Sequence, residues 1–241
     1  MSQVSNPRTA GRQAGLAYLA VILFSIAGYT TMTRLLAGDP NTVPGRLAAS
    51  HTIFDLAFAA MAIGFAAWVA LAVLLYRLVS WSGRLSGALM LIFTAAGVAM
   101  SLLAISQLLP LFDSAPPEAA AAFASSVHGY QRLLLLAQVF SGLWLFPFGW
   151  LVVRSRIAPR LLGVCLIVAG FFYLSQFATA FRPDLDQWWV YRILTTLTGG
   201  TVMAGEFGMC LWLLIKGARE EPLDRAQRPF VVSTWKIGRS Q

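Results

Sequence analysis

Charged side chains are scarce in this sequence: Asp, Glu, Lys and Arg make up 12% of its 241 residues, and only two histidines and two cysteines occur. H-E-x-x-H, C-x-x-C, G-x-S-x-G and phosphate-binding glycine loops are all absent. The histidines are too few for a metal centre, and Cys165 and Cys210 lie inside apolar runs, where small reduced thiols pack. The sequence therefore predicts neither a bound metal nor a cofactor.

Long apolar runs take the place of these motifs. Hydrophobic residues make up 58% of the chain, which is above the range of ordinary soluble domains. A bilayer core of about 30 Å is crossed by about 20 apolar helical residues, and six runs reach that length: Ala14–Leu36, Thr52–Tyr76, Leu85–Leu109, Leu133–Val153, Leu161–Phe181 and Ile193–Ile215. We therefore expect an all-α fold, a polytopic integral membrane bundle of six transmembrane helices.

Three parts follow from these runs: a polar N-terminal tail at 1–13, the six-helix domain at 14–217, and a charged, flexible C-terminal tail at 218–241. With the N-terminus inside, 13 of the 18 basic residues fall on the cytoplasmic side. The positive-inside rule therefore predicts that both termini are cytoplasmic. The same rule and contact with anionic lipid explain the net charge of +8 without nucleic-acid binding.

Four strings carry a family resemblance: R-Q-A-G-L-A-Y-L-A-V-I-L-F-S-I-A-G at 12–28, W-L-F-P-F-G-W at 144–150, R-S-R-I-A-P-R-L-L-G at 154–163 and G-E-F-G-M-C-L-W-L-L-I-K-G at 205–217. In this order they resemble the bacterial membrane-protein family named domain of unknown function 4386, over about residues 12–217. The resemblance implies a multi-pass helical protein of the bacterial cytoplasmic membrane. It implies no established activity and transfers no catalytic residue.

Ionisable residues within apolar runs are costly and are expected to face a bundle interior or a wet cavity. Asp55 lies one turn into the second run, and His51 precedes it by four residues on the same helical face. Arg132 enters the fourth run at a comparable depth. We expect an Asp55–Arg132 ion pair, with His51 or His128 alongside, that serves either as a clamp between helices or as the polar mouth of a pocket.

Glu206 lies 13 residues into the sixth run, roughly 20 Å from its outer end at about 1.5 Å per residue. No basic residue shares its depth. The residues predicted at the same depth are polar but uncharged: Ser25, Thr94, Ser141 and Trp144. Three more polar residues extend a path from Glu206 toward the outer mouth: Gln138, Tyr173 and Gln176.

Pro147 leaves the carbonyl of Leu143 without its usual helical donor. A protonated Glu206 at that depth could donate to this carbonyl, so we expect a hydrogen bond between them. Such a bond would tie helices together, whereas a glutamate without this role would be a ligand or proton site.

Three classes of function remain open. The first is a structural or binding membrane protein, with a cavity open to the outer leaflet for a lipid or other lipophilic small molecule. The second is a membrane enzyme, such as an acid-catalysed cyclase or isomerase of an isoprenoid-like substrate, with Glu206 or Asp55 as its general acid. The third is a small secondary transporter. The expected partners are membrane lipids and the ligand, and the expected ligand-binding residues are Glu206, Asp55, Arg132, His51, Gln138, Trp144, Tyr173 and Gln176.

Overall fold

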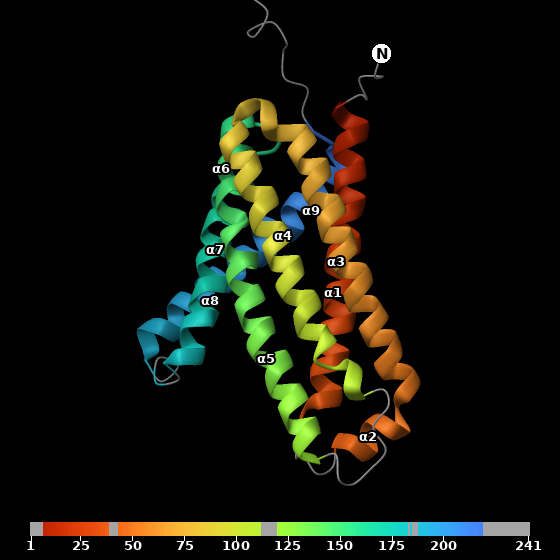
Figure 1. Ribbon diagram of the computed structural model, residues 1–241. Coiled ribbons are helices and arrows are strands. Elements are labelled where there is room, and N and C mark those ends of the chain that lie inside the picture. The colour runs from red at the N-terminus through yellow and green to blue at the C-terminus, as the bar shows by residue number, and fades with distance from the viewer. Residues whose placement is uncertain (1–6, 39–42, 112–119, 183, 185–187, 219–241) are drawn as a thin grey trace, which may run out of the picture.

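A computed structural model describes residues 7–38, 43–111, 120–182, 184 and 188–218 of the chain. Throughout these residues the fold is helical, without a β-strand, and the helices form an elongated bundle (Figure 1). The helices are α1 (Pro7–Leu36), α2 (Val43–Ala49), α3 (His51–Val79), α4 (Arg84–Ser106), α5 (Ala120–Leu143), α6 (Leu145–Ser155), α7 (Arg160–Phe181), α8 (Trp189–Val202) and α9 (Gly208–Lys216). Three short pieces are η1 (Ser80–Ser82), η2 (Leu109–Leu111) and the π-helical η4 (Met203–Phe207).

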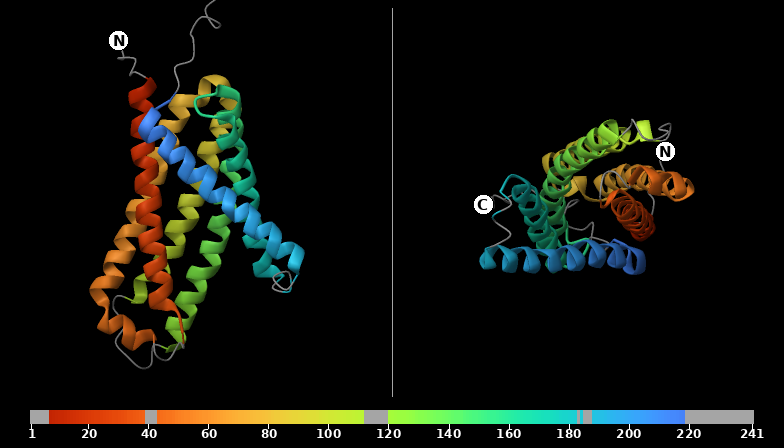
Figure 2. Two further views of the ribbon diagram at one scale, coloured as in Figure 1. Left: turned by 180° about the vertical axis from the view of Figure 1, so that it is seen from behind. Right: turned by 90° about the horizontal axis from the view of Figure 1, so that it is seen from below.

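The helices pack in a defined order. α1 lies against α3 and α9, α4 lies against α3 and α5, and α7 contacts α5, α6 and α8. Figure 2 shows α8, η4 and α9 as one rod that crosses the back of the bundle obliquely. The rod begins beside α7 and ends beside the start of α1, where Arg12 donates a hydrogen bond of 3.4 Å to the carbonyl of Ile215.

Within the described residues, five helices are long and apolar enough to cross a membrane: Pro7–Leu36, His51–Ser82, Arg84–Ser106, Phe123–Ser155 and Arg160–Ala178. The fold is therefore an all-α bundle of membrane-type helices. The sixth predicted span, 193–215, falls on the α8–η4–α9 rod and stays a prediction. Two helices begin well before the predicted apolar runs. α1 begins at Pro7, inside the predicted N-terminal tail, and α5 begins at Ala120 rather than at 133.

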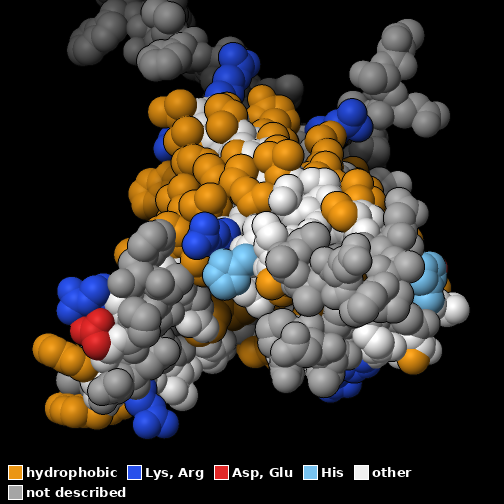
Figure 3. Space-filling model, turned by 60° about the horizontal axis from the view of Figure 1, so that its bottom comes forward, with side chains coloured by type: hydrophobic (Ala, Val, Ile, Leu, Met, Phe, Trp, Pro, Cys, Tyr) orange, Lys and Arg blue, Asp and Glu red, His pale blue; other side chains and the backbone are white. Residues whose placement is uncertain are grey.

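The outside of the bundle is apolar. Large side chains such as Leu16, Leu85 and Leu161 expose 61%, 75% and 71% of their surface, although each lies on a regular helix. Figure 3 shows a broad field of hydrophobic side chains on the flank, with Lys and Arg at its margins. An apolar surface of this extent is unfavourable in water and suits the hydrocarbon of a bilayer.

Paired glycines bring α6 and α7 into backbone contact. A Cβ atom added to Gly149 would lie 2.6 Å from the carbonyl oxygen of Gly163, and one added to Gly163 would lie 2.8 Å from that of Gly149. Gly142 of α5 and Gly170 of α7 form a second pair of the same kind, each seven residues away along the chain from the nearer glycine of the first pair. Small residues at these positions let the helices approach closely, as is common between membrane helices.

Candidate functional site

A cavity of about 430 Å³ lies in the middle of the bundle. Side chains from α1, α3, α4, α5, α7, α8 and η4 line it, and its size falls in the range of about 300–1,000 Å³ typical of small-molecule sites. Its wall is mostly apolar, with side chains such as Ile22, Met61, Phe65 and Val202. Side chains that carry a polar group also line it: Tyr18, Ser25, Tyr29, Thr30, Trp68, Ser101, Gln138, Ser141, Trp144, Tyr173 and Glu206.

Glu206 reaches the cavity from the π-helical turn η4. A π-turn inserts one extra residue into a helix and often marks a functional site, because it changes the direction of the side chains that follow. Gly205 holds this turn against α7, since a Cβ at this position would lie 3.0 Å from the backbone nitrogen of Leu166. Glu206 is thereby fixed beside α7, where Tyr173 donates a hydrogen bond of 2.9 Å to its Oε1.

Trp144 forms an aromatic base for the cavity. It lies at the junction of α5 and α6, where Pro147 lacks the N–H that would bond the carbonyl of Leu143. Its ring stacks on Phe148 at 5.3 Å, and it meets the rings of Tyr18 and Trp68 edge-on at 6.4 and 5.9 Å. Such ring pairs pack rigidly, so the base of the cavity is preformed.

Two polar atoms in this aromatic group have no hydrogen-bond partner among the described residues: the hydroxyl of Tyr18 and Nε1 of Trp68. Tyr18 is fully buried, Trp68 is 8% exposed, and both side chains line the cavity. Buried polar atoms nearly always have a partner, and these two donors, on side chains that line the cavity, lack one among the described residues.

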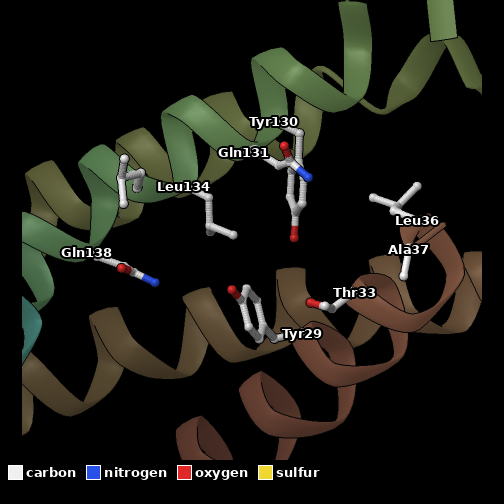
Figure 4. A pocket seen from close by; sticks show the side chains of 9 residues that line it. Tyr29, Thr33, Leu36, Ala37, Tyr130, Gln131, Leu134 and Gln138 are labelled. Carbon is white, nitrogen blue, oxygen red and sulfur yellow. The ribbon is translucent and has the colours of Figure 1, made fainter. Parts of the chain in front are cut away.

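A second pocket, of about 300 Å³, lies between α1 and α5 (Figure 4). Tyr29 and Tyr130 project toward it from opposite walls, and Thr33 and Gln131 add polar groups. Three of its lining residues also line the central cavity: Tyr29, Leu134 and Gln138. The two spaces therefore adjoin, and together they run along the α1–α5 side from the α2 end of the bundle to Glu206.

The structure divides the predicted site residues into two groups. Gln138, Trp144, Tyr173 and Glu206 line the central cavity, as do two of the residues predicted at the depth of Glu206, Ser25 and Ser141. The others do not line it: Gln176, His51, Asp55, Arg132 and the buried Thr94. No three His, Cys, Asp or Glu side chains gather at a metal-binding distance in the part of the chain that is described.

The predicted Asp55–Arg132 ion pair is wrong. Asp55 pairs instead with His51 of its own helix, with 2.9 Å between Nδ1 and Oδ2, and the described residues include no ion pair to Arg132. A spacing of four residues brings two side chains together on any α-helix, whereas contact across helices also needs the right rotation of both. Arg132 is exposed on α5.

The predicted bond from Glu206 to the carbonyl of Leu143 is also not formed in the described part of the chain. The hydrogen-bond partner of Glu206 is the hydroxyl of Tyr173, which supplies a donor directly to Oε1. The glutamate therefore connects two helices, and the helix it bonds is α7 rather than the α5–α6 junction.

Sequence reasoning missed Tyr18 and Trp68. Both lie in apolar runs, where an aromatic residue is equally at home in a packed core or against lipid. The one available signal was the tyrosine hydroxyl, a polar atom well inside the first run that must find a partner. Nothing in the sequence indicated which way either ring faces.

The apolar surface, the helices and the central cavity place the molecule in the class of helical membrane-type bundles. A family model described as Domain of unknown function (DUF4386) matches residues 13–217, and the chain belongs to this family. The resemblance seen in the sequence is thereby confirmed. No curated protein and no solved structure matches the chain significantly.

Proposed function

We propose that this protein is a multi-pass protein of the bacterial cytoplasmic membrane that binds a lipid or other apolar small molecule in its central cavity. The observation that supports this most directly is the cavity of about 430 Å³, with its mostly apolar surface and aromatic base. A lipophilic ligand gains most of its binding free energy from apolar burial, and a few polar groups suffice to orient it.

Access from the membrane is supported by the pocket between α1 and α5. This pocket adjoins the central cavity through Tyr29, Leu134 and Gln138. It lies toward the end of the bundle that carries α2, which the charge distribution assigns to the outer side (Figure 1). A ligand from the outer leaflet would enter between α1 and α5.

The proposed topology has six crossings and both termini in the cytoplasm. The starting end of α1 and the finishing end of α9 lie together, because a Cβ on Gly15 would be 2.7 Å from the backbone nitrogen of Leu214. Chain ends on one side of a membrane require an even number of crossings. Five long helices and the oblique α8–η4–α9 rod meet that requirement.

A membrane enzyme is the second candidate, and the Tyr173–Glu206 hydrogen bond favours it. A carboxyl group beside an apolar cavity could act as the general acid for isomerisation or cyclisation of an isoprenoid-like substrate. Asp55 lies outside the central cavity and is not a candidate for this role. Glu206→Gln would preserve ligand binding but abolish turnover if this second function holds.

Filling the cavity tests the binding function. Ala137 lines the cavity and is 2% exposed, while its neighbour Leu136 faces outward and is 40% exposed. Lipids that copurify with wild type, Ala137→Phe and Leu136→Phe would be identified and quantified by mass spectrometry. We expect one lipid species to be lost from Ala137→Phe alone, and equal lipid profiles for all three folded proteins would contradict the proposal.

A further inference from the structure

The chemical class of the ligand can be read from the two buried donors at the base of the cavity. The indole N–H of Trp68 can only donate a hydrogen bond, and the hydroxyl of Tyr18 can donate one. Both rings pack edge-on against Trp144, so both donors belong to one aromatic group. A polar ligand atom that meets this group must therefore be an acceptor, which in an apolar molecule is an oxygen.

Charge narrows the choice further. No Lys, Arg or His is among the described residues that line the cavity. A phosphate or carboxylate would enter an apolar space without a counter-charge, and burying an uncompensated ion is very costly.

An ammonium group could approach Glu206, but Tyr173 already donates to that side chain. Because an ammonium carries only donors, it would leave the Trp68 N–H without a partner. The lining therefore fits neither sign of charge as well as it fits a neutral acceptor.

We infer that the cavity binds an uncharged amphiphile whose oxygen, from a ketone, ester, ether or alcohol, accepts hydrogen bonds from Tyr18 and Trp68. Its apolar chain lies along Ile22, Met61 and Phe65 and leads toward Tyr29 and Leu134, where the cavity adjoins the α1–α5 pocket. This inference rests on the proposed binding function and specifies the ligand that the same site takes.

The test uses four probes of matched length: undecan-2-one, undecan-2-ol, decylammonium and decanoate. Tritiated undecan-2-one is bound to the full-length protein in nanodiscs, with empty nanodiscs subtracted, and the unlabelled compounds compete. Membrane concentrations are corrected by the partitioning of each compound into empty nanodiscs. We expect the ketone and the alcohol to compete at least tenfold better than the ammonium or the carboxylate.

Three variants identify the donors. Tyr18→Phe and Trp68→Phe each remove one, and each is expected to weaken ketone binding about fivefold, the effect of one ordinary hydrogen bond. Thr94→Val is the matched control, because its hydroxyl is also buried without a partner among the described residues but lines neither the central cavity nor the α1–α5 pocket. This variant should bind the ketone as the wild type does.

The possible results separate the two proposals. If wild type binds the ketone no better than Ala137→Phe, the binding function itself fails. If ketone binding is lost in Ala137→Phe but is the same in Tyr18→Phe, Trp68→Phe and Thr94→Val, the cavity binds ligands and the inference about its donors is wrong. Stronger competition by decylammonium than by the ketone would also overturn it, and would assign the cavity to cations.

Discussion

At the scale of single residues, the Tyr173–Glu206 hydrogen bond links α7 to η4 beside the cavity. In these mostly apolar surroundings each of the two groups depends on the other for this bond. Losing either partner should therefore leave the other unsatisfied, and the identity of the replacement decides how much stability is lost.

Substitution of this pair should separate hydrogen bonding from charge. Glu206→Gln keeps an acceptor for Tyr173 and should unfold at nearly the wild-type temperature, whereas Glu206→Leu and Tyr173→Phe should each lose about 1–3 kcal/mol. Thermal unfolding in mild detergent measures both. Ser175→Ala is the control on α7, because that hydroxyl bonds only to the carbonyl of Phe172 on its own helix. Equal destabilisation by Gln and Leu at position 206 would show that the carboxyl does more than accept this bond.

The His51–Asp55 pair should behave as an ordinary surface pair. Its side chains are 54% and 44% exposed, so the coupling energy should be at most about 0.5 kcal/mol. Double-mutant cycles with His51→Gln, Asp55→Asn and Arg132→Gln would measure the two couplings of Asp55. We expect the effects of the Asp55 and Arg132 substitutions to add. A coupling energy between Asp55 and Arg132 above about 1 kcal/mol would show that the two side chains interact across helices, contrary to the structure.

At the scale of elements, the α6–α7 hairpin depends on its paired glycines. The carbonyl oxygens of Gly149 and Gly163 occupy the space that a Cβ on the opposite residue would need. Backbone atoms cannot rotate away as a side chain can, so the two helices would have to separate.

Gly163→Ala should lower the free energy of unfolding by about 1–3 kcal/mol, because the added methyl group overpacks the contact. Gly200→Ala is the matched control: it is a helical glycine whose added Cβ would meet nothing within 4 Å. This control should leave stability unchanged or raise it by up to about 1 kcal/mol, since alanine favours helix more than glycine. Identical unfolding curves for the two variants would contradict a close α6–α7 contact.

At the scale of the whole molecule, the proposed topology predicts where each loop lies. A reporter active only in the cytoplasm, fused after Ala218, should be active, and the same reporter inserted after Glu118 should be inactive. A reporter active only outside the cytoplasm should give the opposite pair. The same compartment for both positions would mean that the α8–η4–α9 rod does not make the sixth crossing.

The sequence by itself determined the helical class and the approximate ranges of five long apolar helices, and it predicted the depth of the polar residues. Depth follows from counting, because a helix advances about 1.5 Å per residue from a membrane boundary that the charges mark. Ser25, Thr94, Ser141, Trp144 and Glu206 were predicted at one level for this reason, and all of them except Thr94 line the same cavity.

Only the tertiary structure decided which way each helix faces. In a soluble bundle an apolar stripe marks the inner face, but here the outer face is apolar as well, so periodicity does not separate core from surface. Rotation therefore had to come from packing between helices, through close contacts such as Gly149 on Gly163. Because of that packing, Tyr18 and Trp68 line the cavity, Glu206 bonds to Tyr173, and Asp55 pairs with His51 of its own helix instead of Arg132. Contact between helices depends on how each helix is rotated about its axis, whereas counting along the chain gives only depth.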